Sequence, residues 1–293
     1  MKKFLSYAEA VSVGSVSKDL SPNKSASLVY FHFEGDSDFY KLIQSAQINL
    51  QHCIDGYSKS VILKESFSAP GQTQPTKVLK PNKAVFLGQL IDLVKEGYYV
   101  DVFMFAHGSS NRIYMANDLT LSPTELKEAV VEEKSGFNYL PIRMVYQMNC
   151  WGHTFNQTWL DIGAKAVCGA RYVNFYPNQF NAFANDWCKG NVLFEKAVYD
   201  SNTESSRTVM QTLIAADASS QLFPKDWDKC PIGSTVLGDK PCAKSYFSAN
   251  WGIGNGEWRE GQSGKENMNY ASYMFTPGMN ITKSDKGILV WHP

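Results

Sequence analysis

The chain has 293 residues, 44% of them hydrophobic and 13% aromatic, which is enough to build one large globular domain or two smaller ones. Its 28 basic and 28 acidic residues give a formal charge of zero, so the electrostatic argument for a nucleic-acid partner is absent. No segment approaches the roughly 18 consecutive apolar residues of a membrane-spanning helix. We therefore expect a soluble protein with no nucleic-acid partner and no membrane span.

The start of the chain, MKKFLSYAEAVSVGSVSKD, has the two lysines of a signal peptide, but Glu9 and several serines interrupt its apolar stretch. We therefore read no clear signal peptide. The default expectation is a cytoplasmic protein, and a secreted one if a signal was removed.

Six cysteines are scattered through the chain, at positions 53, 150, 168, 188, 230 and 242. They are too few and too far apart for a disulfide scaffold, and no Cys-x-x-Cys pair indicates zinc. Cys230 and Cys242 bracket the loop CPIGSTVLGDKPC, for which a disulfide and two reduced cysteines fit the sequence equally well. We expect Cys168 and Cys188 to be inert packing residues.

Apolar strand patterns alternate with amphipathic helix patterns from residue 28 onward. In chain order we predict a strand at 27–33, a helix at 36–54, a strand at 59–66, an exposed loop at 68–81, a helix at 82–97, a strand at 100–106, a helix at 122–134, a strand at 142–150, a short helix at 152–163, a strand at 164–173, and one or two helices over 178–202. The helix at 122–134 has the clearest start, with Ser122 as cap, Pro123 at the first position and Glu125 at the third.

This alternation predicts an α/β fold, a mainly parallel sheet flanked by helices on both faces. After residue 217 the sequence becomes irregular and rich in Gly, Trp, Asn and Lys. We therefore divide the chain into an N-terminal segment at 1–27, a main domain at 28–217, and a C-terminal extension or small lobe at 218–293.

Two apolar strands end in residues that carry chemistry. The run VDVFMFAHG ends in His107 and Gly108, and the run RMVYQMNC ends in Cys150, which Trp151 and Gly152 follow. In open α/β sheets, ligands bind in the crevice outside the carboxyl ends of the strands. If the two strands are neighbours, a thiol and an imidazole meet at one rim, as a candidate nucleophile and general base.

The residue types suit attack on a carbonyl group. Cysteine attacks as a thiolate, which a helix amino terminus or a nearby imidazolium favours. The oxyanion that forms needs preorganised donors, and backbone N–H groups serve this purpose. Gly108 has no Cβ to hinder a carbonyl substrate, and the N–H of Cys150 is the second candidate donor.

The motifs FMFAHG and YQMNCWG resemble those of the clan CD cysteine peptidases, the group of caspases, legumains and gingipains. The likeness covers roughly residues 28–217 in order and spacing. It implies a caspase-like α/β/α sandwich in which the two strands lie side by side. It also implies His107 and Cys150 as the catalytic dyad, Gly108 and Cys150 as the oxyanion hole, no metal or other cofactor, and a peptide or protein substrate.

The chain departs from the caspase and legumain pattern just before the cysteine. Those families have Gln or Glu two residues before it and Ala directly before it, whereas this chain has Met148 and Asn149. The candidate substrate pocket is formed by Met148, Trp151 and the acidic cluster after the first strand. That cluster consists of Glu34, Asp36 and Asp38, which also fit the start of a helix as caps.

Other roles fit the same residues. His153 lies one helical turn after Cys150 and is an alternative base, although it would leave the His107–Gly108 strand end unexplained. A hydrogen-bonded structural His107 and an inert Cys150 form the general alternative.

The leading hypothesis is a cysteine endopeptidase that cleaves peptide bonds through a thioester acyl-enzyme, with Cys150 as nucleophile and His107 as general base. Two alternatives stay open, because fold alone does not determine function. One is a catalytically inactive caspase-like protein that binds peptides or acts as a scaffold. The other is a cysteine-dependent acyl hydrolase or transferase acting on a small substrate.

The sequence favours a basic or neutral residue over an acidic one on the acyl side of the cut. The acidic cluster and Asp186 would bind Arg or Lys through charge-assisted hydrogen bonds. Arg112 and Arg171 would instead select an acidic residue.

Overall fold

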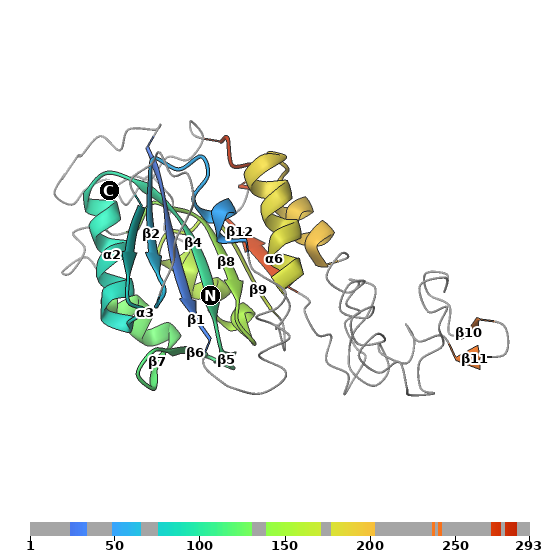
Figure 1. Cartoon of the computed structure of the whole chain (residues 1–293), viewed down its shortest axis with the longest axis horizontal. Coiled ribbons are helices and arrows are strands. Elements are labelled where there is room, and N and C mark those ends of the chain that lie inside the picture. Colours follow the sequence, from blue (N-terminus) through green and yellow to red (C-terminus); the bar gives the residue numbers. More distant parts are fainter. Residues whose placement is uncertain are drawn as a thin grey trace, which may run out of the picture.

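A central sheet with helices on both faces organises the chain (Figure 1). The computed structural model describes residues 24–33, 49–65, 76–130, 139–170, 177–202, 236–237, 240–241, 271–276 and 279–285. Its elements in chain order are β1 (Ser25–His32), η2 (Leu50–Cys53), β2 (Lys59–Leu63), β3 (Thr76–Leu79), α2 (Lys83–Lys95), β4 (Tyr99–Ala106), β5 (Gly108–Ser109), β6 (Arg112–Met115), β7 (Leu119–Leu121), α3 (Pro123–Ala129), β8 (Ile142–Met148), η3 (Gly152–Phe155), α5 (Asn156–Asp161), β9 (Ala166–Ala170), α6 (Pro177–Ala184), η4 (Asn185–Lys189), β10 (Val236–Leu237), β11 (Lys240–Pro241) and β12 (Ala271–Phe275). A further helix spans 194–202.

The main sheet has the strand order β12-β9-β8-β4-β1-β2-β3. Its neighbouring strands are parallel except for β12, which runs antiparallel to β9. The chain adds β2 and β3 on one side of β1, then returns to add β4, β8 and β9 on the other side. The strand order thus reverses between β1 and β4, and the crevice outside the carboxyl ends of the strands at such a switch point is where open α/β sheets bind ligands.

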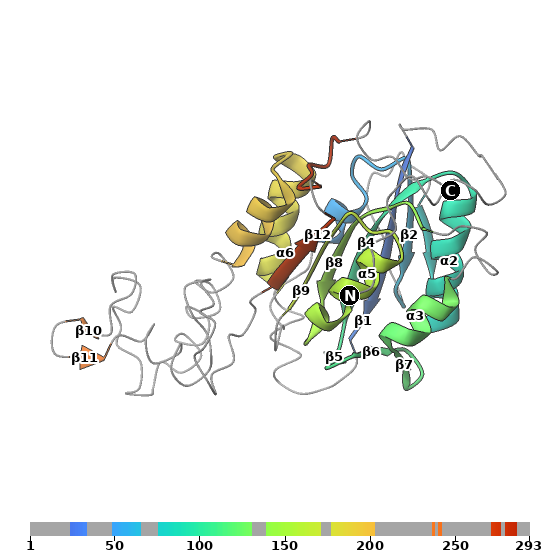
Figure 2. The same cartoon turned by 180° about the vertical axis from the view of Figure 1, so that it is seen from behind.

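The side chains of β4 are buried on both faces of the sheet. Val102 and Met104 belong to a core cluster that includes residues of α2, α3 and α5, and we call this side the α2 face. Phe103 and Phe105 belong to a second cluster with residues of η2, α6 and η4, and we call this side the α6 face. Figures 1 and 2 show the helices on either side of the strands.

The predicted α/β fold, with a mainly parallel sheet and helices on both faces, is confirmed. The strands predicted at 100–106 and 142–150 are β4 and β8. The predicted helix start at Ser122 is also confirmed, because the side chains of Ser122 and Glu125 each bond to the other residue's backbone N–H in a capping box. The predicted helix at 36–54 lies mostly outside the described residues, and its last part forms η2.

Two predictions of local structure were incomplete or wrong. The exposed loop predicted at 68–81 contains β3, an edge strand paired with β2. Its side chains are exposed or half-exposed, so they give no apolar pattern to detect. The small sheet β5-β6-β7 between β4 and α3 was not predicted, because its strands are too short for a periodic signal.

Segments outside the predicted main domain also contribute to the sheet. β1 begins at Ser25, inside the predicted N-terminal segment, and β12 comes from the predicted C-terminal extension. The division of the chain at 28–217 and 218–293 stays a prediction. In the part of the chain that the structure describes, no helix combines the length and the apolar character needed to cross a membrane.

Candidate functional site

His107 and Cys150 follow neighbouring parallel strands, as predicted. β4 pairs with β8, and the last pair in their register is Phe105 with Met148. His107 comes two residues after the first of these and Cys150 two residues after the second. Both residues are half-buried. The strand pairing therefore brings the two predicted site residues to one end of the sheet.

The backbone of Gly108 lies against the backbone of Cys150. A Cβ on Gly108 would stand 2.4 Å from the carbonyl oxygen of Cys150 and 2.9 Å from Nδ2 of Asn149. Both distances are too short for a real Cβ, so only glycine fits without a shift of the chain. From the sequence alone, the approach of a substrate is the expected reason for this glycine. The structure gives a reason inside the protein, the close contact between the two strand ends.

The small sheet β5-β6-β7 orients the His107–Gly108 segment. Gly108 pairs with Ile113, and beside this pair the N–H of Tyr114 donates to the carbonyl oxygen of His107 at 2.9 Å. This pattern makes Gly108 and Ile113 a pair without mutual hydrogen bonds, so the N–H of Gly108 points away from β6. The three strands lie at the lower end of the sheet in Figure 1.

A tight turn follows β8 and contains Cys150. The N–H of Gly152 donates to the carbonyl oxygen of Asn149 at 3.1 Å, and Trp151 has a φ of 59°. The left-handed conformation of a bulky residue costs about 1–3 kcal/mol and persists only where surrounding contacts impose it. Here the turn packs on β9, since a Cβ on Gly169 would lie 2.4 Å from the carbonyl carbon of Gly152.

Thr154 joins this turn to the small sheet. Its hydroxyl donates to the carbonyl oxygen of Trp151 at 2.8 Å and accepts from the N–H of Asn111 at 3.0 Å. Asn111 lies between β5 and β6, at the tip of the hairpin that follows His107. The two segments that carry His107 and Cys150 are therefore connected through a second contact besides Gly108.

Other predicted site residues take different positions. The ring of His107 contacts the ring of Phe33 edge-on, with the two ring centroids 5.3 Å apart. Nδ1 of His153 lies 3.1 Å from the carbonyl oxygen of Ala170. Met148 is fully buried in the core of the α6 face, whereas Trp151 is half-buried.

The charged residues considered for specificity are only partly described. Arg112 is exposed on β6, where it alternates with the buried Ile113. Asp186 lies on η4, and burial raises the pKa of its carboxyl group, with a further contribution from Asp200. Glu34, Asp36, Asp38 and Arg171 lie outside the described residues.

Three of the described cysteines, Cys53, Cys168 and Cys188, have thiols whose pKa is raised. Burial raises the pKa of Cys53 and Cys168 well above the ordinary thiol value, and it raises that of Cys188 to about 11. These three are protonated thiols at neutral pH, which agrees with the packing role predicted for Cys168 and Cys188. Cys230 and Cys242 lie outside the described residues, so their pairing stays open.

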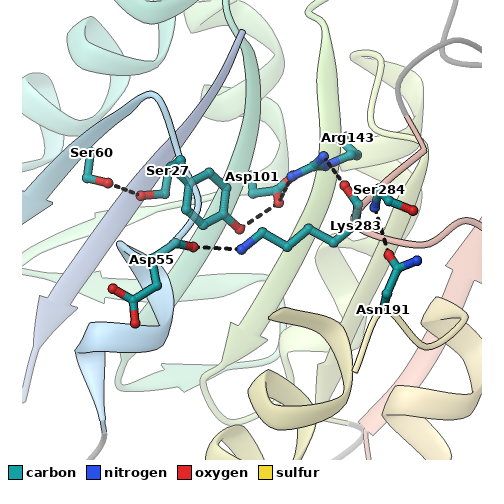
Figure 3. Close-up of polar contacts among 9 residues, drawn as sticks. Ser27, Asp55, Ser60, Asp101, Arg143, Asn191, Lys283 and Ser284 are labelled. Atoms are coloured by element: carbon teal, nitrogen blue, oxygen red, sulfur yellow. Dashed lines mark hydrogen bonds and ion pairs between the residues drawn. The ribbon is translucent and has the colours of Figure 1, made fainter. Parts of the chain in front are cut away.

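Sequence reasoning missed a buried ion pair between β4 and β8. Asp101 accepts from Nε and Nη2 of Arg143 at 2.8 and 2.6 Å and from the hydroxyl of Tyr57 at 2.7 Å (Figure 3). Burial opposes the charge of Arg143, but Asp101 outweighs it and raises the pKa of the guanidinium. At roughly 3.3 Å per strand residue, Asp101 lies about 20 Å from His107 along the chain, so the ion pair is no part of the candidate site.

A surface cavity of about 260 Å³ also lies apart from the two strand ends, between helix 194–202 and β12. Glu195 lines it, but its carboxylate already accepts hydrogen bonds from Tyr273 at 2.6 Å and Asn280 at 3.1 Å. This carboxylate is therefore engaged within the protein, and we assign no binding role to the cavity.

Among the described residues, no group of three or more His, Cys, Asp or Glu side chains is arranged to hold a metal ion. A comparison with models of known protein families finds no match, and a comparison with curated proteins finds none either. The resemblance to clan CD peptidases therefore rests on the two motifs alone.

Proposed function

We propose that this chain is a cysteine endopeptidase of caspase-like fold, with Cys150 as nucleophile and His107 as general base. The observation that carries this proposal is the contact of Gly108 with the Cys150 turn at the ends of two adjacent parallel strands. A thiol and an imidazole delivered to one end of a sheet are the two groups that nucleophilic acyl transfer needs.

The alternation of side chains supports a shared face for the two groups. Phe105 and Met148 are paired and both point into the α6 face. Both strands end before His107 and Cys150, and continued alternation past the strand ends puts these two residues on that same side. The ring contact of His107 with Phe33, which packs against the α6-face core, agrees with this placement.

In the proposed reaction, His107 takes the proton of the Cys150 thiol, and the sulfur attacks the carbonyl carbon of the scissile peptide bond. The carbonyl oxygen becomes an oxyanion that accepts hydrogen bonds from the N–H groups of Gly108 and Cys150. The C–N bond then breaks as the imidazolium returns the proton to the leaving amine. Water, activated by the same imidazole, hydrolyses the thioester and releases the acid.

We propose a basic or neutral residue on the acyl side of the cut. Gly108 lies opposite Ile113, and the side of Gly108 that a Cβ would occupy faces Cys150. Arg112 alternates with the inward-facing Ile113, so its side chain lies on the other face of β6. His107 alternates with Gly108 in the same way, so its side chain lies on the same face of the small sheet as that of Arg112. Selection of an acidic residue by a peptide library, lost in Arg112→Ala, would therefore overturn this proposal.

The test is cleavage-site profiling with a peptide library. The purified unsubstituted chain and the variants Cys150→Ala, His107→Ala and His153→Ala are each incubated with the same library. We expect cleavage by the unsubstituted chain and by His153→Ala, and loss of cleavage in the other two variants with unchanged melting temperatures. If His153→Ala abolishes cleavage and His107→Ala does not, the base is misassigned.

The same experiment separates the alternatives. Rapid alkylation of Cys150 without peptide cleavage would favour an acyl hydrolase or transferase with a small substrate. If Cys150 reacts no faster than an ordinary thiol and no peptide is cut, a peptide-binding or scaffolding protein is favoured instead.

A further inference from the structure

Asn149 lies between the two strand ends and has an unusual hydrogen-bonding state. Its side chain is fully buried, and Nδ2 donates to the carbonyl oxygen of Cys150 at 3.3 Å. Its other polar atom, Oδ1, is buried without a hydrogen-bond partner. The amide of Asn149 cannot be turned over to exchange Nδ2 and Oδ1, because Oδ1 would then face the carbonyl oxygen of Cys150, and two acceptors cannot form a hydrogen bond.

The unpaired oxygen means that Asn149 is a costly choice for stability alone. A buried polar atom without a partner loses its hydration and gains nothing in return, so an apolar residue would serve packing better. The neighbouring buried Asn156 differs, since its Oδ1 accepts from Nε2 of Gln147 at 3.1 Å. The useful contact of Asn149 is therefore the one that Nδ2 makes to Cys150.

That contact fixes the peptide plane between Cys150 and Trp151. The carbonyl oxygen of Cys150 is held by Asn149 on one side and lies against Gly108. The N–H in this plane belongs to Trp151 and points opposite to the C=O in a trans peptide, away from Asn149. The link to the candidate oxyanion donors is through Gly108, because Cys150 O and Asn149 Nδ2 both lie against the side of Gly108 that a Cβ would occupy. Asn149 directly follows Met148, whose side chain lies in the α6-face core, so continued alternation turns the side chain of Asn149 toward the α2 face.

We propose that Asn149 is a positioning residue, which holds the carbonyl group of Cys150 against Gly108 and so keeps the N–H of Gly108 in the orientation that stabilises the oxyanion. This inference rests on the proposed peptidase function and deepens it. Asn149 does not touch the reacting atoms. It acts through the carbonyl group of Cys150.

The test compares Asn149→Ala and Asn149→Asp with the matched control Asn156→Ala. Three quantities are measured: kcat/KM for the best library peptide, inhibition by the corresponding peptide aldehyde, and the alkylation rate of Cys150 with iodoacetamide. The aldehyde forms a tetrahedral adduct with the thiol and therefore reports on the oxyanion contacts. Alkylation involves no oxyanion and reports on the thiolate alone.

For Asn149→Ala we expect kcat/KM and aldehyde affinity to fall at least about tenfold, since outright loss of one oxyanion donor costs roughly 10²–10³ in kcat. Alkylation should stay within about threefold, because the thiolate and its base are intact. Asn149→Asp, which keeps the size but removes the donor, should lose hydrolysis in the same way. The melting temperature should fall less in Asn149→Ala than in Asn156→Ala, because only the former removes an unpaired buried oxygen.

Wild-type hydrolysis in both Asn149 variants would overturn the inference while leaving the proposed function intact. A parallel fall of hydrolysis, alkylation and melting temperature would reduce Asn149 to a packing residue and would overturn it too. If the unsubstituted chain neither cuts peptides nor shows rapid alkylation of Cys150, the proposed function itself fails.

Discussion

The two strand ends touch at Gly108. Replacing this glycine by a larger residue therefore tests the contact directly. Because a Cβ there would lie 2.4 Å from the carbonyl oxygen of Cys150, Gly108→Ala must push the two backbones apart. We expect a loss of roughly 1–3 kcal/mol in the free energy of unfolding, typical of overpacking, together with loss of hydrolysis. Urea denaturation and peptide hydrolysis measure the two effects.

Gly88 provides the matched control. It lies inside α2, and a Cβ there would meet nothing within 4 Å. Alanine at this position should stabilise the protein by roughly 0.5–1 kcal/mol, because glycine loses more conformational entropy in a helix. If Gly108→Ala proves as well tolerated as Gly88→Ala, the described contact between the strand ends is incorrect.

At the residue scale, the sequence predicted the candidate dyad but not its surroundings. His107 and Cys150 could be found because each ends an apolar strand, which is a local pattern. The roles of Asn149 and Trp151 depend on a turn whose geometry comes from packing on β9 and against Gly108. No local pattern encodes such contacts, so these two residues were noted in the sequence without a structural role.

At the scale of elements, Thr154 connects the turn after β8 to the hairpin after β4. Thr154→Val keeps the shape of the side chain and removes the bonds to Trp151 and Asn111. We expect a loss of roughly 0.5–1.5 kcal/mol in unfolding free energy, because the exposed N–H of Asn111 can bond to water and the carbonyl oxygen of Trp151 keeps the N–H of Thr154 at 3.0 Å. Hydrolysis should fall as well, since the hairpin orients Gly108. Normal stability and normal kcat/KM in this variant would show that the connection has no role.

We expect the ion pair of Asp101 and Arg143 to be the main side-chain contribution to stability between the first halves of β4 and β8. Both side chains are at most 1% exposed, and Nη1 of Arg143 also donates to the carbonyl oxygen of Lys283 at 2.7 Å. Removal of one partner leaves a buried, uncompensated charge, so Arg143→Met should cost roughly 3–5 kcal/mol in unfolding free energy. Chemical denaturation gives this value directly.

The control for this variant is the ion pair between Lys196 and Asp200, whose lysine side chain is 63% exposed. Lys196→Met should leave the unfolding free energy unchanged within error, because solvent screens exposed pairs. Equal effects of the two substitutions would contradict the structural role that we assign to Arg143.

Elements were predicted from sequence wherever a period of two or 3.6 residues extends far enough. The helices α2 and α3 have such a period, with caps at Asn82 and Ser122. The strands β4 and β8 are instead continuous apolar runs, because both of their faces are buried. The small sheet β5-β6-β7 and the edge strand β3 are only two to four residues per strand, too short for a period to appear.

At the scale of the whole molecule, buried acids make the protein sensitive to alkali. Burial raises the pKa of Cys53, Cys168, Tyr57 and Tyr146, and it raises that of Cys188 from 9.0 to about 11. Above pH 9 the unfolded chain releases these protons while the folded chain keeps them. The free energy of unfolding therefore falls as the pH rises.

We expect the melting temperature to decrease steadily between pH 9 and about 11, the window given by Cys188. Cys188→Ala should make this decrease less steep, because one of the groups with a raised pKa is removed. Differential scanning calorimetry at a series of pH values provides the measurement. A melting temperature that stays constant across this window would contradict the burial of these groups.

The fold class followed from the alternation of strands and helices, but the extent of the sheet did not. β12 pairs with β9 across about 100 residues of sequence, as in the pair of Tyr273 with Cys168. Such a pairing depends on tertiary packing, and its strand is short and antiparallel at a sheet edge. Sequence patterns report local structure, so they could not assign this strand to the main sheet.

The central claim, a Cys150 nucleophile activated by His107, is tested most directly by the pH dependence of Cys150 alkylation. The rate with iodoacetamide is measured by mass spectrometry from about pH 5 to about pH 9.5, in the unsubstituted chain and in His107→Ala. The account predicts an inflection well below the ordinary cysteine value of about 8.5, and a return to about that value in His107→Ala. An ordinary inflection in the unsubstituted chain, or the same profile in both proteins, would contradict it.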